Sequence, residues 1–472
     1  MFEKYIEKDK TNLITNLQNL IRIPSVHSES KNPKYPFGEK TADALEYILN
    51  LGSTFGFKAK NLDNYCGYLE FGSSDKLIGI IGHLDVVPEG DNWDFPPFNA
   101  EIHNNKIYGR GAIDDKGPVM ASLYAMKSVM EYCKENSIPI NKRIRLILGL
   151  NEEKDWKCVK HYKEHEEIPS IGFSPDANFP CIYAEKGIIS PYIIMDYSKY
   201  KNADIVLTKI DCNDNALNVV PEYCSCILKL QNKLIYKDVI SEIFDLQKEF
   251  KFNISAEILN DNEIKIISKG IRAHSAHPEL GENAISRLII VLNKLFKNHN
   301  IGIPIFDLFE KYIGLDYNGN KLEINTPDES GQLTLNVARF EFSENDLKIS
   351  LNLRIPINST FEFVEGKFDE VCKKYNNIFY KFEGKMNPLH VSKGSYLVKT
   401  LCKIYNEETN SNLEPIPIGG ATYARAFENF VSFGANLPGQ KDMCHQTNEF
   451  ISIDNLLIAY KIYCKAIFEL LQ

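Results

Sequence analysis

The first part of the chain alternates apolar runs with helical repeats. Residues 77–81 and 144–148 are apolar-rich runs of strand length, which is typical of buried strands. Apolar residues recur at helical spacing between Leu45 and Phe55 and again from Val119 to Cys133, which predicts two helices. Pro118 would stand in the first turn of the second helix, where its missing N–H costs nothing. The alternation predicts an α/β sheet in about the first 190 residues.

The pattern changes in residues 188–388. Ile349, Leu351, Leu353 and Ile355 alternate with polar residues, which predicts a half-exposed antiparallel strand. Residues 285–295 carry an apolar stripe at helical spacing. We interpret this region as an inserted α+β domain, because its length is that of an ordinary domain. Since the α/β pattern returns after it, residues 1–187 and 389–472 are expected to form one interrupted domain.

Composition excludes several classes of protein. The 472 residues carry a net charge of −9, which disfavours nucleic acids and anionic membranes as partners. No apolar run approaches the length of a membrane span, and the charged N-terminal segment lacks the apolar core of a signal peptide. Eleven cysteines without a CxxC pair predict a cytoplasmic protein without a disulfide framework. Cys224 and Cys226 are expected to be core residues on one side of a strand.

Imidazoles and carboxylates recur at Gly- or Pro-marked strand ends and loops outside the insert. The five candidate metal ligands are His83, Asp114, Glu153, Asp176 and His445. One such residue alone is more often structural or on a solvated surface, but chance explains all five together poorly. These side chains are ligands for zinc-like ions. The sequence therefore predicts two divalent cations, for which Zn²⁺ is suited and Mn²⁺ or Co²⁺ fit the same ligands.

The cations would share one ligand, because two neighbouring divalent ions require a bridging carboxylate. Asp114 is placed to bridge, since it immediately precedes the predicted helix. Each cation then needs one imidazole and one further carboxylate. We expect His83 and Asp176 to serve one cation. Glu153 and His445 would serve the other.

Two further acidic residues are expected to act beside these ligands. Asp85 lies two residues after His83, on the same side of the strand, so it would orient the imidazole. Glu152 precedes the ligand Glu153, and adjacent side chains point in different directions. Glu152 would therefore remain uncoordinated and act as a general base and then as a general acid.

These motifs resemble the zinc-dependent aminoacylase and carboxypeptidase-G superfamily of metallopeptidases, and most closely its bacterial dipeptidase V (Xaa-His dipeptidase, carnosinase-like) branch. The stretches that carry the resemblance are Gly82–Pro88, Gly109–Pro118, Asn151–Glu153, Gly172–Pro180 and Glu185–Gly187. The likeness extends from Leu20–Ser25 almost to the C-terminus. It implies an α/β fold of two domains: a dinuclear-metal aminopeptidase-like catalytic domain and an inserted α+β lid domain. It also implies the bridging, base and ligand roles given above.

The resemblance implies further roles for residues that bind the substrate. His274 would contact the scissile carbonyl, while the nearby His277 departs from the usual pattern. Asn218 matches an asparagine that contacts the substrate, and Gly420 lies in a glycine-rich substrate loop expected to open a helix. Arg354 matches an arginine that binds the substrate's C-terminal carboxylate, for which a guanidinium fork is suited. From the residues alone, a loop histidine and a surface ion pair are the alternatives for His274 and Arg354.

The resulting hypothesis is a zinc-dependent dipeptidase that acts on dipeptides with a free C-terminal carboxylate. One alternative is an N-acyl amino acid deacylase of the aminoacylase or succinyl-diaminopimelate desuccinylase type. Another is a silent peptide-binding homologue, which is disfavoured because the base and every ligand position are filled. The long insert resembles that of monomeric relatives, so a monomer is expected.

Overall fold

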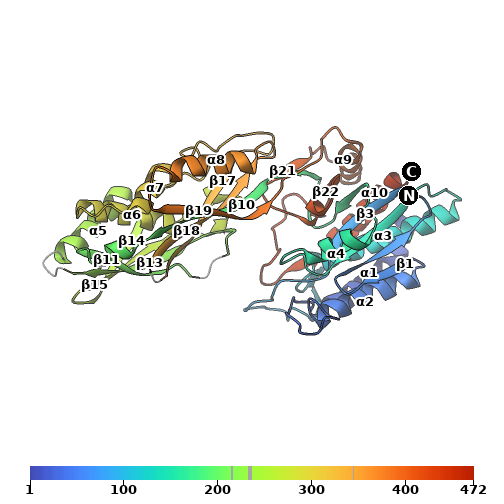
Figure 1. Ribbon diagram of the computed structural model, residues 1–472. Coiled ribbons are helices and arrows are strands. Elements are labelled where there is room, and N and C mark those ends of the chain that lie inside the picture. The colour runs from blue at the N-terminus through green and yellow to red at the C-terminus, as the bar shows by residue number, and fades with distance from the viewer. Residues whose placement is uncertain (214–215, 232–235, 344) are drawn as a thin grey trace. The chain divides into compact units, whose positions relative to one another are not determined.

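The computed structural model describes residues 1–213, 216–231, 236–343 and 345–472 (Figure 1). The chain forms two compact units. The first comprises Met1–Ala184, Leu389–Ile416 and Ala421–Gln472, and the second comprises Glu185–Pro388 and Pro417–Gly420. Gly420 therefore belongs to the inserted unit, although the sequence analysis placed it in the catalytic domain. Within the described ranges, every helix is too short or too polar to cross a lipid bilayer.

The first unit contains a long mixed sheet with the strand order β1-β2-β6-β3-β7-β22-β9-β20. These strands are β1 (Lys58–Leu62), β2 (Cys66–Phe71), β6 (Arg143–Gly149), β3 (Leu77–His83), β7 (Ile171–Ser174), β22 (Phe430–Ser432), β9 (Ile182–Glu185) and β20 (Leu389–His390). Strand β3 runs parallel to both β6 and β7. All of its residues are buried, as its continuous apolar run predicts. Parallel strands bring their carboxyl ends to one edge of the sheet.

Helices cover this sheet. They are α1 (Glu3–Ile21), α2 (Glu39–Thr54), α3 (Lys116–Glu135), α4 (Lys157–His165), α9 (Tyr396–Thr409), α10 (Ile453–Leu471) and the 3₁₀ helix η4 (Tyr423–Ala426). Helix α3 packs against α1, α10 and β3 (Figure 1). Smaller sheets pair β24 (Phe450–Ser452), β5 (Lys106–Tyr108) and β4 (Glu101–His103), and β23 (Ala435–Asn436) with β8 (Ala177–Asn178).

A glycine allows α3 to begin close to the end of β3. A Cβ atom added to Gly82 would lie 2.4 Å from Asp115 Oδ2 and 2.5 Å from Val119 Cγ2. A side chain at this position would therefore require the side chains of Asp115 and Val119 to shift. The close approach brings His83, at the end of β3, beside the residues that start α3.

The second unit contains two four-stranded antiparallel sheets. The first has the order β17 (Thr334–Ser343), β18 (Asp346–Ile355), β10 (Gly187–Asp196) and β19 (Ile378–Met386), and the second has the order β11 (Ile205–Asp211), β13 (Tyr223–Leu230), β15 (Glu263–Lys269) and β14 (Asn253–Asn260). Helices α5 (Tyr236–Phe250), α6 (Ala284–Asn298), α7 (Pro304–Tyr312) and α8 (Phe361–Cys372) cover them. Short elements complete the unit: β12 (Val219–Val220), β16 (Ala273–His274), η1 (Ser198–Tyr200) and η3 (Pro278–Leu280). Strand β21 (Ile416–Ile418) lies where the chain passes between the units. An α/β fold of two units is confirmed.

The prediction of a half-exposed strand at residues 349–355 is wrong. Strand β18 lies between β17 and β10, and both of its faces are buried. Its polar positions are buried as well: Ser350 is 8% exposed, Asn352 4% and Arg354 5%. The alternation therefore separates an apolar core face from a buried polar face.

Cys212 and Cys224 form a disulfide, which the sequence analysis did not expect. Cys212 directly follows β11 and Cys224 lies in β13, and these strands pair antiparallel with Asp211 opposite Ser225. The two cysteines therefore occupy the next facing positions. The register between strands, rather than the cysteine spacing, brings the sulfur atoms together. Cys226 is buried, as expected.

Candidate active site

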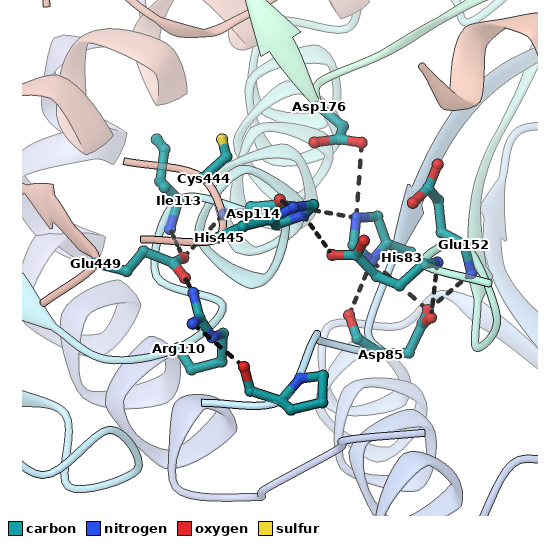
Figure 2. Close-up of polar contacts among 12 residues, drawn as sticks. His83, Asp85, Arg110, Ile113, Asp114, Glu152, Asp176, Cys444, His445 and Glu449 are labelled. Carbon is teal, nitrogen blue, oxygen red and sulfur yellow. Dashed lines mark hydrogen bonds and ion pairs between the residues drawn. The ribbon is translucent and has the colours of Figure 1, made fainter. Parts of the chain in front are cut away.

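Imidazoles and carboxylates converge in the first unit, largely at the carboxyl edge of the main sheet (Figure 2). His83 ends β3, residues 152–153 follow β6, and Asp176 follows β7. Asp114 lies two residues before the start of α3, and His445 lies in the loop before β24. We call these six side chains the carboxylate–imidazole cluster; its members are His83, Asp114, Glu152, Glu153, Asp176 and His445.

Asp114 occupies the middle of the carboxylate–imidazole cluster. Its Oδ1 atom lies 3.0 Å from His83 Nε2, and its Oδ2 atom lies 3.0 Å from His445 Nε2. The two oxygens of one carboxylate thus address two different imidazoles. A carboxylate that bridges two cations requires this division.

Each imidazole also has a second carboxylate. His83 Nε2 lies 3.6 Å from Asp176 Oδ2, and His445 Nε2 lies 3.1 Å from Glu153 Oε1. Two groups result, each with its potential ligand atoms within 4.8 Å of one another and each including Asp114. Ligand atoms around a tetrahedral zinc ion with bonds of about 2.1 Å are about 3.4 Å apart. The donor set and its spacing therefore fit two divalent cations.

Asp85 has a different contact from the one expected. His83 Nδ1 lies 2.9 Å from the main-chain carbonyl oxygen of Asp85 and 3.6 Å from its carboxylate. The carboxylate instead accepts hydrogen bonds of 3.1 Å from the backbone N–H groups of both Glu152 and Glu153. The carbonyl thus orients the imidazole, with Nδ1 as donor and Nε2 left to face the carboxylates. The Asp85 side chain fixes the segment that carries the glutamates.

The imidazoles are strongly basic in these surroundings. Burial lowers the pKa of His83, but hydrogen bonds to Asp114 and Asp176 outweigh it and raise the pKa well above its ordinary value. Hydrogen bonds to Asp114 and then to Glu153 raise the pKa of His445 to about 11. Burial would raise the pKa of Asp114, but the hydrogen bonds from both imidazoles hold it below its ordinary value. The carboxylate–imidazole cluster thus favours positive charge.

The pKa values of the two glutamates after β6 are shifted in the direction opposite to that of Asp114. Burial raises the pKa of Glu152 well above its ordinary value; His83 acts against this rise and Glu153 adds to it. Burial and the charge of Asp114 also raise the pKa of Glu153. A buried carboxylate with a high proton affinity is suited to general base work near neutral pH.

The second unit brings the predicted substrate residues Asn218 and His274 together. Strand β12 pairs with β16 so that Val219 lies opposite His274, and the backbone N–H of Ser275 donates to the Asn218 carbonyl at 2.8 Å. The exposed His274 accepts a 3.1 Å hydrogen bond at Nδ1 from the backbone N–H of Ala276. A neutral imidazole that accepts at Nδ1 carries its proton on Nε2.

Arg354 belongs to a buried polar patch that we define as Ser275, Asn352 and Arg354. Its Nε donates to Asn352 Oδ1 at 3.1 Å and its Nη2 to Ser275 Oγ at 3.3 Å. Its burial contradicts the alternative of a surface ion pair. The glycine-rich loop passes the same segment, because a Cβ atom on Gly419 would lie 3.0 Å from that of Ala276. Asn218, His274, Arg354 and Gly420 all lie in the inserted unit.

The segment after Gly420 forms a different type of helix from the one expected. The loop leads into the four-residue 3₁₀ helix η4, whose first N–H groups include one capped by the Thr422 side chain. Such a short turn has no extended row of aligned peptide dipoles. The loop therefore does not open an α-helix whose N-terminus could bind an anion.

Three buried charged residues beside the carboxylate–imidazole cluster were not among the predicted site residues. Asp115 Oδ2 accepts a hydrogen bond of 3.1 Å from the backbone N–H of His83. Arg110 and Glu449 form an ion pair with an N–O distance of 2.8 Å. Asp115 and Arg110 stand in the motif around Asp114, but a motif does not show which segment each side chain contacts.

Residues 79–469 match the family described as "Peptidase family M20/M25/M40". The chain belongs to this family. It is therefore a metallopeptidase, as the sequence resemblance predicted.

A relative matched over nearly its whole length supports this membership, and two solved structures share the fold. The chain is 37% identical over 473 residues to the Bacillus subtilis (strain 168) protein named "Putative dipeptidase YtjP", with 99% of each chain covered. Human carnosine dipeptidase 1 has a similar fold, with a TM-score of 0.60 at 14% identity over 100% of this chain and 98% of that one. Bacillus subtilis YXEP, titled a dinuclear metal binding peptidase from the M20 family, has a TM-score of 0.51 at 10% identity over 98% and 99% of the two chains.

Proposed function

We propose that this member of the M20/M25/M40 family is a dipeptidase that uses two divalent cations, preferably Zn²⁺, to hydrolyse dipeptides with a free C-terminal carboxylate. The observation that carries the proposal is the division of the Asp114 carboxylate between His83 and His445. The names of the relatives support it, since they include dipeptidases and a dinuclear metal binding peptidase. We further propose that the enzyme acts in the cytoplasm as a monomer.

Five side chains would hold the cations. His83 and Asp176 would serve one cation, and Glu153 and His445 would serve the other. Asp114 would be shared by both. When bound, the cations supply Lewis acidity, which polarises the scissile carbonyl and makes water easier to deprotonate.

Glu152 would move the proton. It belongs to one group of potential ligands with His83 and Glu153, but it is not needed to complete either set of ligands. Its carboxylate takes a proton from the attacking water as the new C–O bond forms. It then gives this proton to the departing nitrogen as the C–N bond breaks, so the amine leaves neutral.

The inserted unit would supply groups that recognise the substrate. His274 Nε2–H donates to the oxygen of the scissile carbonyl, where negative charge develops. The Arg354 guanidinium binds the free carboxylate of the dipeptide. Asn218 and the backbone at Gly420 contact the peptide between these two groups.

A substrate panel tests the proposal. The metal-stripped protein is assayed after addition of Zn²⁺, Mn²⁺ or Co²⁺ with dipeptides, tripeptides, C-terminally amidated dipeptides and N-acetyl or N-succinyl amino acids. We expect free dipeptides to be hydrolysed far faster than tripeptides and amidated dipeptides, N-acyl amino acids not to be hydrolysed, and no activity before a cation is added. Turnover of the N-acyl amino acids alone would instead indicate a deacylase. Activity of the stripped protein would contradict the role of the cations.

A further inference from the structure

Glu449 is a fully buried carboxylate behind the carboxylate–imidazole cluster (Figure 2). Its Oε1 atom accepts hydrogen bonds from the backbone N–H groups of Ile113 at 3.0 Å and Asp114 at 3.3 Å. Its Oε2 atom accepts from Arg110 Nη1 at 2.8 Å. One carboxylate therefore fixes the backbone of the residue that lies between the two imidazoles.

Arg110 extends this anchor to two further segments. It is 3% exposed, and its Nη1 also donates to the carbonyl of Gln446 at 3.2 Å. Its Nη2 donates to the carbonyls of Pro88 at 3.3 Å and Glu89 at 3.1 Å. The guanidinium thus joins the loop after β3, the loop before α3 and the loop that follows His445.

These three loops carry or adjoin side chains whose spacing decides whether two cations bind. His83 ends the strand before the first loop, Asp114 lies in the second loop, and His445 immediately precedes Gln446 in the third. The three residues are remote from one another in sequence. Ligand geometry must hold to a few tenths of an ångström for tight binding. Groups that position ligands typically change metal affinity about 10- to 100-fold when removed.

We propose that Arg110 and Glu449 are positioning residues that set the spacing of His83 and His445 across Asp114, and thereby the affinity for the second cation. This inference rests on the proposed two-cation function. Neither side chain is a ligand or reaches the reacting atoms. They act through the backbone of Asp114 and through the carbonyls of the flanking loops.

Three variants separate positioning from a general contribution to folding. Glu449→Gln keeps a carbonyl oxygen for the backbone N–H groups but loses the ion pair with Arg110. The double substitution Arg110→Met with Glu449→Leu replaces the pair with apolar side chains, which often preserves stability. The matched control is Glu70→Gln, because Glu70 and Arg145 form a buried ion pair with an N–O distance of 2.6 Å between β2 and β6, among residues that no step of the proposed reaction uses.

The measurement is Zn²⁺ titration of metal-stripped protein by calorimetry in competition with a chelator, together with thermal unfolding of the stripped protein. We expect unaltered protein and Glu70→Gln to bind two cations with the same affinities. Both variants at residue 449 should bind the second cation about 10- to 100-fold more weakly, including the apolar double variant with its folding intact.

Affinities in the double variant that equal those of unaltered protein would overturn the positioning role, because the pair would then serve folding alone. Equal weakening by Glu70→Gln would overturn it as well, since any buried pair would have the same effect. If unaltered protein binds fewer than two cations, the positioning role and the proposed function both fail. The behaviour of unaltered protein thus distinguishes the two failures.

Discussion

The carboxylate–imidazole cluster of the first unit and the polar patch of the second are built from opposite kinds of side chain. The cluster is rich in acidic groups, and its ligands project from strand ends and loops. The polar patch consists of a hydroxyl, an amide and a guanidinium; two of these lie on one face of β18. The first arrangement is suited to cations and the second to a carboxylate. We propose that the difference reflects a division of labour, with chemistry in the first unit and recognition of the substrate in the second.

Removal of the cations should have the largest effect. Chelation should abolish hydrolysis, because the carbonyl is no longer polarised and the water is no longer activated. It should also destabilise the first unit, since a cation at about 100 times its Kd adds about 2.7 kcal/mol of stability. Activity assays and calorimetric unfolding of stripped and reloaded protein measure both changes. If removal of the cations left the unfolding of the first unit unchanged and destabilised the second, the cations would have to be assigned to the second unit.

Glu152→Gln should have the next largest effect. The amide keeps the size of the side chain but cannot accept the proton, so kcat should fall by about 10²- to 10⁴-fold. Cation stoichiometry should be unchanged, because other side chains complete both ligand sets. Steady-state kinetics and metal analysis check this result, with the exposed Glu164→Gln as the control. A variant that lost one cation and kept its kcat would assign Glu152 as a ligand instead.

The sequence predicted the first unit better than the second for a physical reason. Residues 77–81 and 144–148 became β3 and β6, and the helix predicted at Gly117–Pro118 begins at Lys116. Side chains at the ends of parallel strands meet whatever the rest of the sheet does. The members of the cluster that end or follow β3, β6 and β7 can therefore be predicted from local signals, whereas Asp114 and His445 come from loops that these signals do not place.

The parts that the sequence missed depend on neighbours that are distant in the chain. Burial of Arg354 follows from the position of β18 between β17 and β10, which alternation within one strand does not reveal. The Cys212–Cys224 disulfide depends on the register of β11 and β13. The role of the Asp85 carbonyl was missed because every residue has a main-chain carbonyl, so the sequence does not show which one contacts an imidazole.

Arg354→Lys tests the recognition half of the comparison. Lysine keeps the charge but loses the planar fork, so KM for free dipeptides should rise about 10- to 100-fold, the worth of a charged hydrogen bond of about 1.5–3 kcal/mol. The already weak turnover of C-terminally amidated dipeptides should hardly change. Kinetics on matched free and amidated substrates provide the measurement, with the exposed Arg272→Lys as the control. Equal losses of activity on both substrates would show that Arg354 does not bind the C-terminal carboxylate.

Ser275→Ala should have the smallest effect and gives the sharpest test of the polar patch. The change removes the hydrogen bonds of Ser275 Oγ to Asn352 and from Arg354 Nη2, but leaves the 3.1 Å bond between Arg354 Nε and Asn352. The guanidinium should therefore stay in place with more freedom. We expect the free energy of unfolding to fall by about 1–3 kcal/mol and KM to rise by less than in Arg354→Lys. Denaturant unfolding and kinetics measure these values beside the exposed Ser198→Ala. Because Ser275 belongs to the second unit and all of the proposed cation ligands belong to the first, cation affinity should not change. A loss of cation affinity would show that the two units do not divide chemistry from recognition.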